Sequence, residues 1–200
     1  IGWVAHAQIR SVGTVGGSVA HADPAAELPV ACSVLEARMT VAGRSGKREI
    51  SADDFFVTHL TSAIEADEML LEIAIPAAPD GAGQSFVEYS RRHGDFALGG
   101  AAVVMPLDAE GRCAGVRITL MTAAPVPWRA RTAEKLLEGS APELAMLSAA
   151  AEAAASEINP TGDIHGDSSY RKALARTLCL QALTEAAATA TPPNATGMDQ

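Results

Sequence analysis

The feature that most constrains the fold is a glycine-rich segment, residues 10–29, which reads RSVGTVGGSVAHADPAAELP. Its glycines at 13, 16 and 17 let the backbone approach another group without a Cβ in the way. Thr14 and Ser18 add hydroxyl groups on either side of the glycine pair. Such a segment can direct several N–H groups at an anion, and phosphate is the usual ligand. A hairpin turn with Gly16-Gly17 at its apex is the structural alternative, which spacing alone favours because short glycine motifs recur by chance.

Composition excludes several classes of function. The formal net charge is −9 and no basic stripe is present, which argues against a nucleic-acid partner. Cys32, Cys113 and Cys179 lie far apart, and neither they nor the histidines have metal-ligand spacing. We therefore expect no metal site, and reduced thiols in a cytoplasmic protein. No apolar run reaches the length of a membrane span, and no Ser-His-Asp pattern predicts a catalytic residue.

Local patterns predict an α+β chain of two units. The first unit, 1–76, should contain a short helix over 29–37, a hairpin of 38–42 with 47–50, a cap at 51–54, and a strand over 68–76 that ends at a proline. The linker is the Pro/Gly-rich stretch 77–83.

The second unit, 84–188, should form a small three-stranded antiparallel sheet with helices. Its strands are predicted at 85–90, 96–107 and 114–122, and its helices at 130–139, 142–158 and 168–188. Residues 189–200, with two prolines and polar side chains, are predicted to be a disordered tail.

Two polar strings remain in the second unit. Arg91 to Ala97 reads RRHGDFA and is most simply a solvated charged turn. Asp163 to Arg171 reads DIHGDSSYR, in which His165 beside Asp163 could act as a base with an orienting carboxylate. A structural role is the favoured interpretation for both strings.

The glycine-rich segment resembles the second FAD-contacting segment of the flavin subunit of molybdenum hydroxylases, the xanthine dehydrogenase and carbon monoxide dehydrogenase family. That pattern is I-R-x-x-G-T-x-G-G-S-x-x-H-A-D-P-A-A-E/D-L-P, and residues 9–10, 13–18 and 21–29 match it. The two polar strings are similar to the family's R-R-x-G-D-x-A and D-x-H-G-s-x-x-Y-R. The resemblance covers about residues 1–188. It implies the C-terminal half of a PCMH-type FAD-binding domain, followed by a domain like the carbon monoxide dehydrogenase flavoprotein C-terminal domain.

The resemblance also implies cofactor-binding residues. Residues Thr14, Val15, Gly16, Gly17 and Ser18 correspond to the turn that contacts the pyrophosphate, with the glycines placed where a Cβ would meet the cofactor. Glu27 corresponds to a carboxylate near the ribityl and phosphate region, and Leu70 to an apolar residue beside the cofactor. Asp23 is expected to be a turn or cap residue first and a contact second. No catalytic side chain is expected, because the flavin carries the electron chemistry.

The implied function is that of the flavin subunit of a heterotrimer, an oxidoreductase subunit that is not active alone. A molybdopterin-binding large subunit would hydroxylate the substrate, and a small [2Fe–2S] subunit would pass electrons to FAD here and onward to an external acceptor. The family pattern includes an earlier A-G-G-x-S/T loop in an N-terminal segment that this sequence does not contain, so we expect the chain alone to bind FAD weakly or not at all. Val87 and Glu88 stand near a position where the family often has lysine.

Two alternatives remain open at this point. The chain could be a truncated or split subunit that serves only in complex assembly, which a flavin spectrum would distinguish. It could also be a phosphate-ligand binding module unrelated to the family, which would have no iron–sulfur partner.

Overall fold

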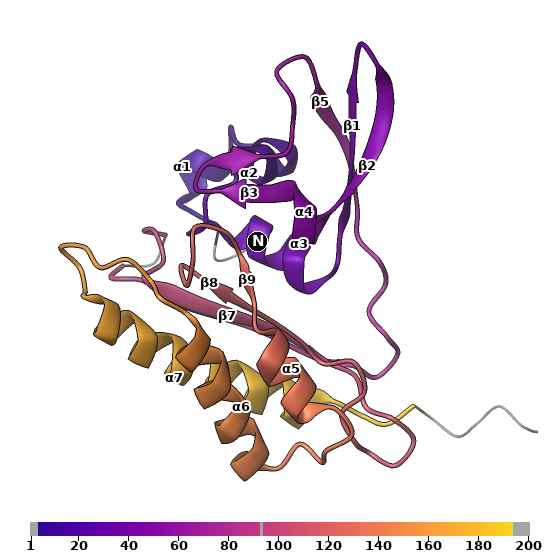
Figure 1. The fold of residues 1–200 in the computed structure, drawn as a ribbon, viewed down its shortest axis with the longest axis vertical. Helices are drawn as coiled ribbons and strands as arrows, with labels where there is room; N and C mark the ends of the chain where they lie inside the picture. The colour runs from indigo at the N-terminus through magenta and orange to yellow at the C-terminus, as the bar shows by residue number, and fades with distance from the viewer. Residues whose placement is uncertain (1–3, 93, 194–200) are drawn as a thin grey trace, which may run out of the picture.

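The computed structural model describes residues 4–92 and 94–193, and Figure 1 shows their arrangement. The first unit, drawn in indigo to purple, is a set of short helices beside two small antiparallel sheets. The three-stranded sheet has the order β2-β1-β5, and β3 pairs with β4. The elements of this unit are α1 (Ala7–Arg10), α2 (Val15–His21), α3 (Glu27–Val34), β1 (Arg38–Gly43), β2 (Gly46–Ser51), α4 (Ala52–Phe55), β3 (Phe56–Thr58), β4 (Thr61–Ser62) and β5 (Met69–Ala74).

Local sequence signals account for the hairpin, the cap and the last strand of this unit. In the β1–β2 hairpin, Gly43 pairs with Gly46 across the turn residues Arg44 and Ser45, and Gly46, directly after them, has a positive φ that glycine adopts without strain. Ser51 caps α4 by accepting a hydrogen bond from the backbone N–H of Asp54 at 3.3 Å. β5 ends before Pro76. The structure confirms all three predictions.

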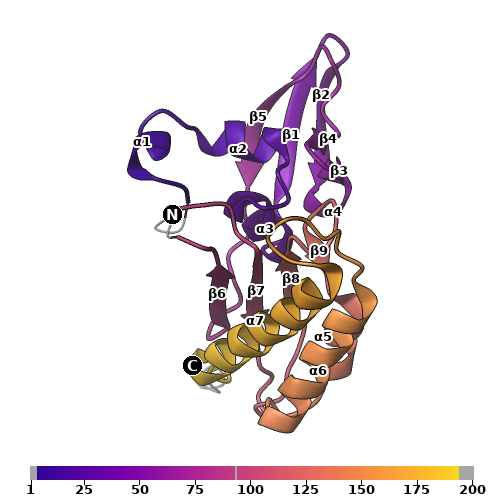
Figure 2. The same cartoon turned by 90° about the vertical axis from the view of Figure 1, so that its left-hand side faces the viewer.

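The second unit is a four-stranded antiparallel sheet with helices on one face, as Figures 1 and 2 show. The three predicted strands are confirmed, and a two-residue strand that was not predicted extends the sheet beyond β8. The strand order is β6-β7-β8-β9. The elements are β6 (Gly83–Tyr89), β7 (Gly99–Met105), β8 (Arg117–Met121), β9 (Trp128–Arg129), α5 (Arg131–Leu137), α6 (Leu144–Glu157) and α7 (Ser168–Thr189).

The central strand β7 is buried on both faces because the sheet is covered twice. Side chains alternate between the faces of a strand. Ala101 and Val103 belong to the core shared with α5, α6 and α7, whereas Ala102 and Val104 pack with Val30 and other residues of α3. α3 of the first unit therefore acts as the cover for the second face of the sheet (Figure 2).

Side-chain bonds tie α3 to this sheet. Arg129 on β9 donates from Nη1 to the carbonyl oxygen of Ser33 at 3.2 Å and from Nε to Oε1 of Glu134 on α5 at 2.9 Å. Arg117 on β8 pairs with Glu36, just after α3, at 3.1 Å. The two units are thus packed against each other through buried or half-buried polar contacts as well as apolar ones.

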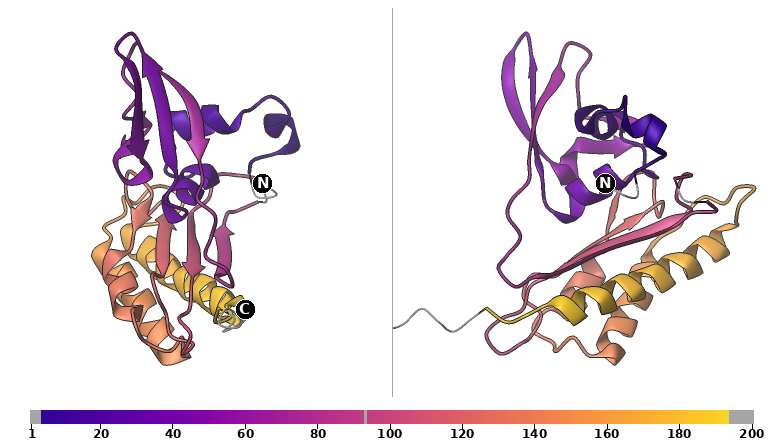
Figure 3. Two further views of the ribbon diagram at one scale, coloured as in Figure 1. Left: turned by 90° about the vertical axis from the view of Figure 1, so that its right-hand side faces the viewer. Right: turned by 180° about the vertical axis from the view of Figure 1, so that it is seen from behind.

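The last helix, α7, lies across β6 and β7, as the view from behind in Figure 3 shows. Asp167 caps it by accepting from the backbone N–H of Tyr170 at 2.7 Å. At its other end the helix approaches β6 so closely that a Cβ on Gly83 would lie 1.9 Å from the carbonyl oxygen of Ala186. Gly83 is the last residue of the predicted linker, yet it is already paired in the sheet.

Several predicted boundaries are wrong by a few residues. The helix predicted over 29–37 begins at Glu27 and ends at Val34. The predicted tail begins inside α7, because Thr189 is the last helical residue, and residues 194–200 of that tail lie outside the described residues. None of the helices in the described part of the chain has the length and apolar character needed to cross a membrane.

Candidate functional site

The glycine-rich segment forms the N-terminal end of α2 and not a hairpin turn. Thr14 is the N-cap residue, and its Oγ1 accepts a hydrogen bond from the backbone N–H of Gly17 at 2.9 Å. Val19 anchors the helix because it is fully buried in the core of the first unit. The hairpin alternative is therefore wrong, since a good cap and one buried valine outweigh the low helix propensity of two glycines.

Gly16 and Gly17 differ in the space available for a side chain. A Cβ on Gly17 would lie 2.9 Å from Oγ1 of Thr14, so the cap itself requires a glycine or a shift there. A Cβ on Gly16 would meet nothing within 4 Å, which leaves the backbone open to a bound group. Substitution of Gly17 would therefore disturb the helix start as well as a ligand, and Gly16 is the better position for a test.

The surface around Gly16 carries neutral hydrogen-bond donors. The first backbone N–H groups of a helix have no partner within the helix and attract anions. Thr14 and Val15 are exposed, and Ser18 is half-buried in the next turn. The residues present thus fit a phosphate or diphosphate group.

Leu70 lies close to this helix, since β5 contacts α2. It is on β5 and packs against the same core cluster that contains Val19 of α2. The structure therefore brings residues 14–18 and Leu70, which are far apart in sequence, into one region.

Asp23 and Glu27 occupy the connection from α2 to α3. Asp23 accepts a hydrogen bond on Oδ1 from the backbone N–H of Ala25 at 2.8 Å, which makes it a turn residue as expected. Glu27 is the first residue of α3 and is half-buried. The pKa of the Glu27 carboxyl is raised, mainly by burial and also by the charge of Asp23. Hydrogen bonds from the backbone N–H groups of Glu27 and Ala5 offset part of this increase.

A cavity of about 1000 Å³ begins at this connection and continues between the units. Most of its wall comes from three stretches of sequence: the end of the glycine-rich segment, the RRHGDFA string and the DIHGDSSYR string with the residues before it. His59, Leu98, Thr122, Ala124 and Pro125 complete the wall. The polar side chains on the wall are Asp23, His59, Arg91, Arg92, Asp95, Thr122, Asn159, Thr161, Asp163, His165 and Arg171.

Hydrogen bonds join the two polar strings on one side of this cavity. Arg91 Nη1 lies 3.1 Å from Nδ1 of His165. Asp163 accepts from the backbone N–H of His165 at 2.8 Å and from Nη2 of Arg171 at 2.7 Å, and these bonds lower the pKa of the Asp163 carboxyl. Arg171 also donates to the carbonyl oxygen of Leu98 at 3.2 Å, which holds the strand end against α7.

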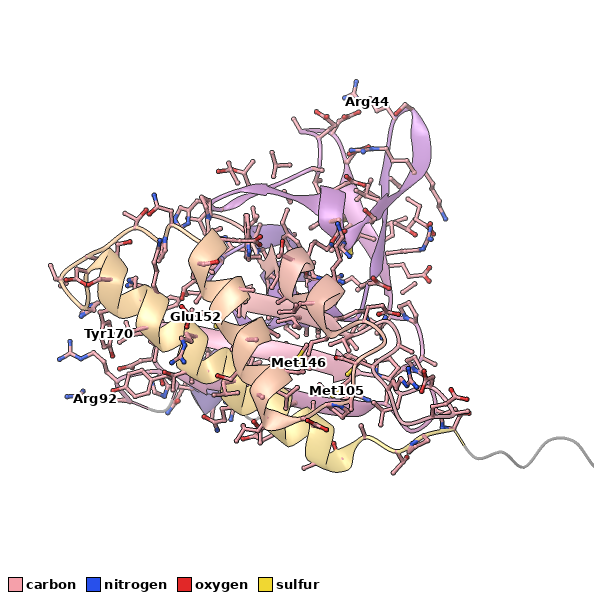
Figure 4. All side chains as sticks on the ribbon, turned by 60° about the horizontal axis from the view of Figure 1, so that its bottom comes forward. Arg44, Arg92, Met105, Met146, Glu152 and Tyr170 are labelled. Atoms are coloured by element: carbon pink, nitrogen blue, oxygen red, sulfur yellow. The ribbon has the colours of Figure 1, made fainter. Side chains whose placement is uncertain are left out.

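Apart from Asp23, the polar wall residues were not among the predicted site residues. Arg91, Arg92 and Asp95 were interpreted as a solvated turn, and both arginines are exposed, with Arg92 pointing away from the ribbon near Tyr170 in Figure 4. Their exposure agrees with the structural interpretation, but the same turn also borders the cavity. The only signal in the sequence was their likeness to family strings. His93 of this turn lies outside the described residues.

The carboxyl group of Glu88, on β6, lies near Glu27. Burial, followed by the charge of Glu27, raises the pKa of Glu88 to about 7.

Within residues 4–92 and 94–193 no group of three or more His, Cys, Asp or Glu side chains could hold a metal ion.

Comparison with protein families matches both units. Residues 1–78 match the model described as the FAD binding domain in molybdopterin dehydrogenase, and residues 84–186 match the CO dehydrogenase flavoprotein C-terminal domain.

Individual relatives agree with the family models. The chain is 41% identical over 190 residues to the alpha subunit of the 6-hydroxypseudooxynicotine dehydrogenase complex of Paenarthrobacter nicotinovorans, covering 95% of this chain and 64% of the relative. It is 34% identical to the carbon monoxide dehydrogenase medium chain of Hydrogenophaga pseudoflava, with 92% and 63% covered. A solved structure of carbon monoxide dehydrogenase from that organism superposes with a TM-score of 0.91 at 35% identity, covering 94% of this chain and 66% of that one. The chain therefore spans a little less than two thirds of the length of these relatives.

Proposed function

This chain belongs to the FAD-binding medium subunits of the molybdenum hydroxylase family, the carbon monoxide dehydrogenase and xanthine dehydrogenase type, and on that premise we propose that it is the flavin subunit of a molybdenum-containing hydroxylase or dehydrogenase. Family membership overturns the alternative of an unrelated phosphate-binding module.

The observation that supports this proposal most directly is the open backbone at Gly16 beside the Thr14 cap. The free N–H groups at the start of α2, with the hydroxyls of Thr14 and Ser18, would hold the diphosphate of FAD, and Val15 would contact it from the same turn. Residues 13–18 contain neither lysine nor arginine, so neutral donors would carry this role.

Three further residues of this chain would complete the contacts. Leu70 would contact the cofactor from β5, and Glu27 would accept hydrogen bonds from hydroxyl groups of the ribityl chain. Asp23 would hold the turn that leads from one contact to the other, through its bond to the N–H of Ala25. The cavity that begins at Asp23 has the volume typical of ligand and cofactor sites.

When bound, FAD supplies the redox chemistry, taking electrons from [2Fe–2S] clusters on a partner subunit and passing them to an external acceptor. The chain's own residues bind and orient the cofactor. We propose that the partners are a molybdopterin-binding large subunit and a [2Fe–2S] small subunit in a heterotrimer, and that this chain is inactive without them. The three cysteines are free and buried, which supports a cytoplasmic location.

Flavin content of the purified complex tests the proposal. The wild-type complex should retain FAD, visible in its absorbance spectrum, whereas Gly16→Val should lose it because the valine side chain would occupy the space open to the diphosphate. The thermal unfolding temperature of the variant should stay close to that of the wild type, because a Cβ at this position meets no protein atom within 4 Å. A wild-type complex that assembles without flavin would instead support a role in assembly only, and normal flavin content in Gly16→Val would contradict the assigned contact.

A further inference from the structure

Glu88 lies on the face of β6 that is turned toward α3. Its neighbour Val87 packs in the core beneath the helices, while Phe86, on the same face as Glu88, packs with the α3 cluster. The residue opposite Glu88 on β7 is Gly100, which has no side chain, and Met121 follows on β8. The side chain of Glu88 therefore lies on the same side of the sheet as α3, which packs on the neighbouring strands β7 and β8.

One oxygen of this carboxyl group lacks a hydrogen-bond partner in the described part of the chain. Its Oε2 atom is buried and accepts or donates no hydrogen bond. Other enclosed carboxylates differ: Oε1 of Glu134 accepts from Arg129 at 2.9 Å, and Glu68 is held by Arg48 at 2.7 Å. Glu88 is half-buried, and an enclosed carboxylate oxygen without a cation or donor disfavours the charged form and favours the neutral acid.

Among the described residues, the charged side chain that shifts the pKa of Glu88 is negative. It is Glu27, at the start of α3, and the charge of Asp23, in the turn before α3, in turn raises the pKa of Glu27. The position opposite on β7 is a glycine and contributes no charge. Burial and the charge of Glu27 together raise the pKa of Glu88 to about 7, so its proton is exchanged within the physiological range.

We propose that Glu88 is a positioning residue of the flavin site. When Glu88 carries a proton, Glu27 is the only charged carboxylate of the two, and the anionic cofactor can bind beside them. This rests on the proposed function, in which Glu27 contacts FAD. If Glu88 ionises, a second negative charge appears beside Glu27, and both repel the diphosphate. FAD therefore prefers the protonated form, and its affinity should fall as pH rises through about 7.

The test is a titration of FAD into the flavin-free complex, monitored by flavin fluorescence, at about pH 6 and about pH 8.5. Wild-type affinity should fall over this interval, by about tenfold for each unit by which FAD raises the pKa of Glu88. Glu88→Gln, which is neutral at both values, should bind with the affinity that the wild type has at low pH and should show little change. Glu49→Gln, an exposed carboxyl on β2, serves as the control and should keep the wild-type profile.

Calorimetry of the wild type gives a second readout that requires no variant. FAD binding at about pH 7.5 should take up part of a proton, seen as a binding enthalpy that depends on the ionisation enthalpy of the buffer. Wild-type affinity that is unchanged with pH, no proton uptake, or an unaltered pH profile in Glu88→Gln would each overturn the role of Glu88 while leaving the flavin assignment intact. A wild-type complex that binds no FAD at any pH would overturn both.

Discussion

The hydroxyl group of Ser33 on α3 lies 3.2 Å from the hydroxyl group of Thr119 on β8, and both side chains are almost completely buried. This bond joins the two units at a point that water does not reach. Ser33→Ala should lower the free energy of unfolding by about 1–3 kcal/mol, because the Thr119 hydroxyl loses its partner. Urea unfolding measures this, and Thr119→Val added to Ser33→Ala should recover part of the loss. No recovery in the double variant would mean that the loss came from packing alone.

Glu134 on α5 holds Arg129, the residue that donates to the carbonyl oxygen of Ser33 and so joins the two units. It accepts from the backbone N–H of Ile118 and from Nε of Arg129, whose side chain is 7% exposed. Glu134→Ala should cost about 1–3 kcal/mol of stability, because the N–H of Ile118 and Nε of Arg129 lose their acceptor, while Arg129 keeps Glu36 as a partner at 3.4 Å. The exposed pair of Arg38 with Glu49 is the matched control, and Glu49→Ala should cost no more than about 1 kcal/mol. Similar losses in the two variants would contradict this ranking.

Glu68 should make stability depend on pH in the acid range. Two hydrogen bonds from Arg48, with one from the N–H of Glu65, lower the pKa of its carboxyl to about 2. Because the pKa in the folded state is below the ordinary value of 4.5, this contribution to stability is complete above about pH 4.5 and is lost as pH falls toward 2. Arg48→Gln should therefore destabilise the protein at neutral pH, and the difference from the wild type should shrink in acid. Arg44→Gln, in the exposed hairpin turn, is the control and should leave the loss of stability at acid pH unchanged. An equal effect of the two variants would contradict the role of the Arg48–Glu68 pair.

We propose that residues 1–76 and 84–188 are two structural units with a cleavable connection. Residues 76, 77, 79 and 80 are exposed and lie outside helices and strands, whereas Gly83 is buried in β6. Limited proteolysis should cut first within 76–80. The fragments should remain associated through α3 and should separate only in denaturant, as gel filtration before and after urea would show. Initial cleavage within β7 or β8 would contradict the division.

Local chemistry explains which elements could be predicted from the sequence. The β1–β2 hairpin, the Ser51 cap and the long helix α7 depend on neighbouring residues, and the sequence predicts them correctly. β9 has two residues, and its pairing with β8 depends on tertiary contacts. α2 contains two glycines, and its stability comes from the packing of Val19. Local sequence patterns therefore do not predict either β9 or α2.

The same distinction applies to the site. The predicted site residues were found by resemblance to the family. One continuous pattern contains residues 14–18, Asp23 and Glu27, and a later strand contains Leu70. The cavity wall joins Asp23 to Arg91 and His165, which come from three distant stretches. Their meeting depends on how α3 packs on the sheet, and no local pattern encodes it. That Oε2 of Glu88 has no hydrogen-bond partner among the described residues is likewise visible only in three dimensions.

The position of α7 across β6 and β7 has a consequence for synthesis. Ser85 on β6 bonds to Glu185 on α7 at 2.7 Å, and these residues are 100 positions apart. The ribosome therefore releases the whole sheet before the helix that covers one of its faces. Until α7 emerges, the apolar side chains of Val87, Ala101 and Val103 have no cover, and such surfaces promote aggregation. A nascent chain stalled before residue 168 would thus depend on chaperones, whereas the completed chain covers this face by itself.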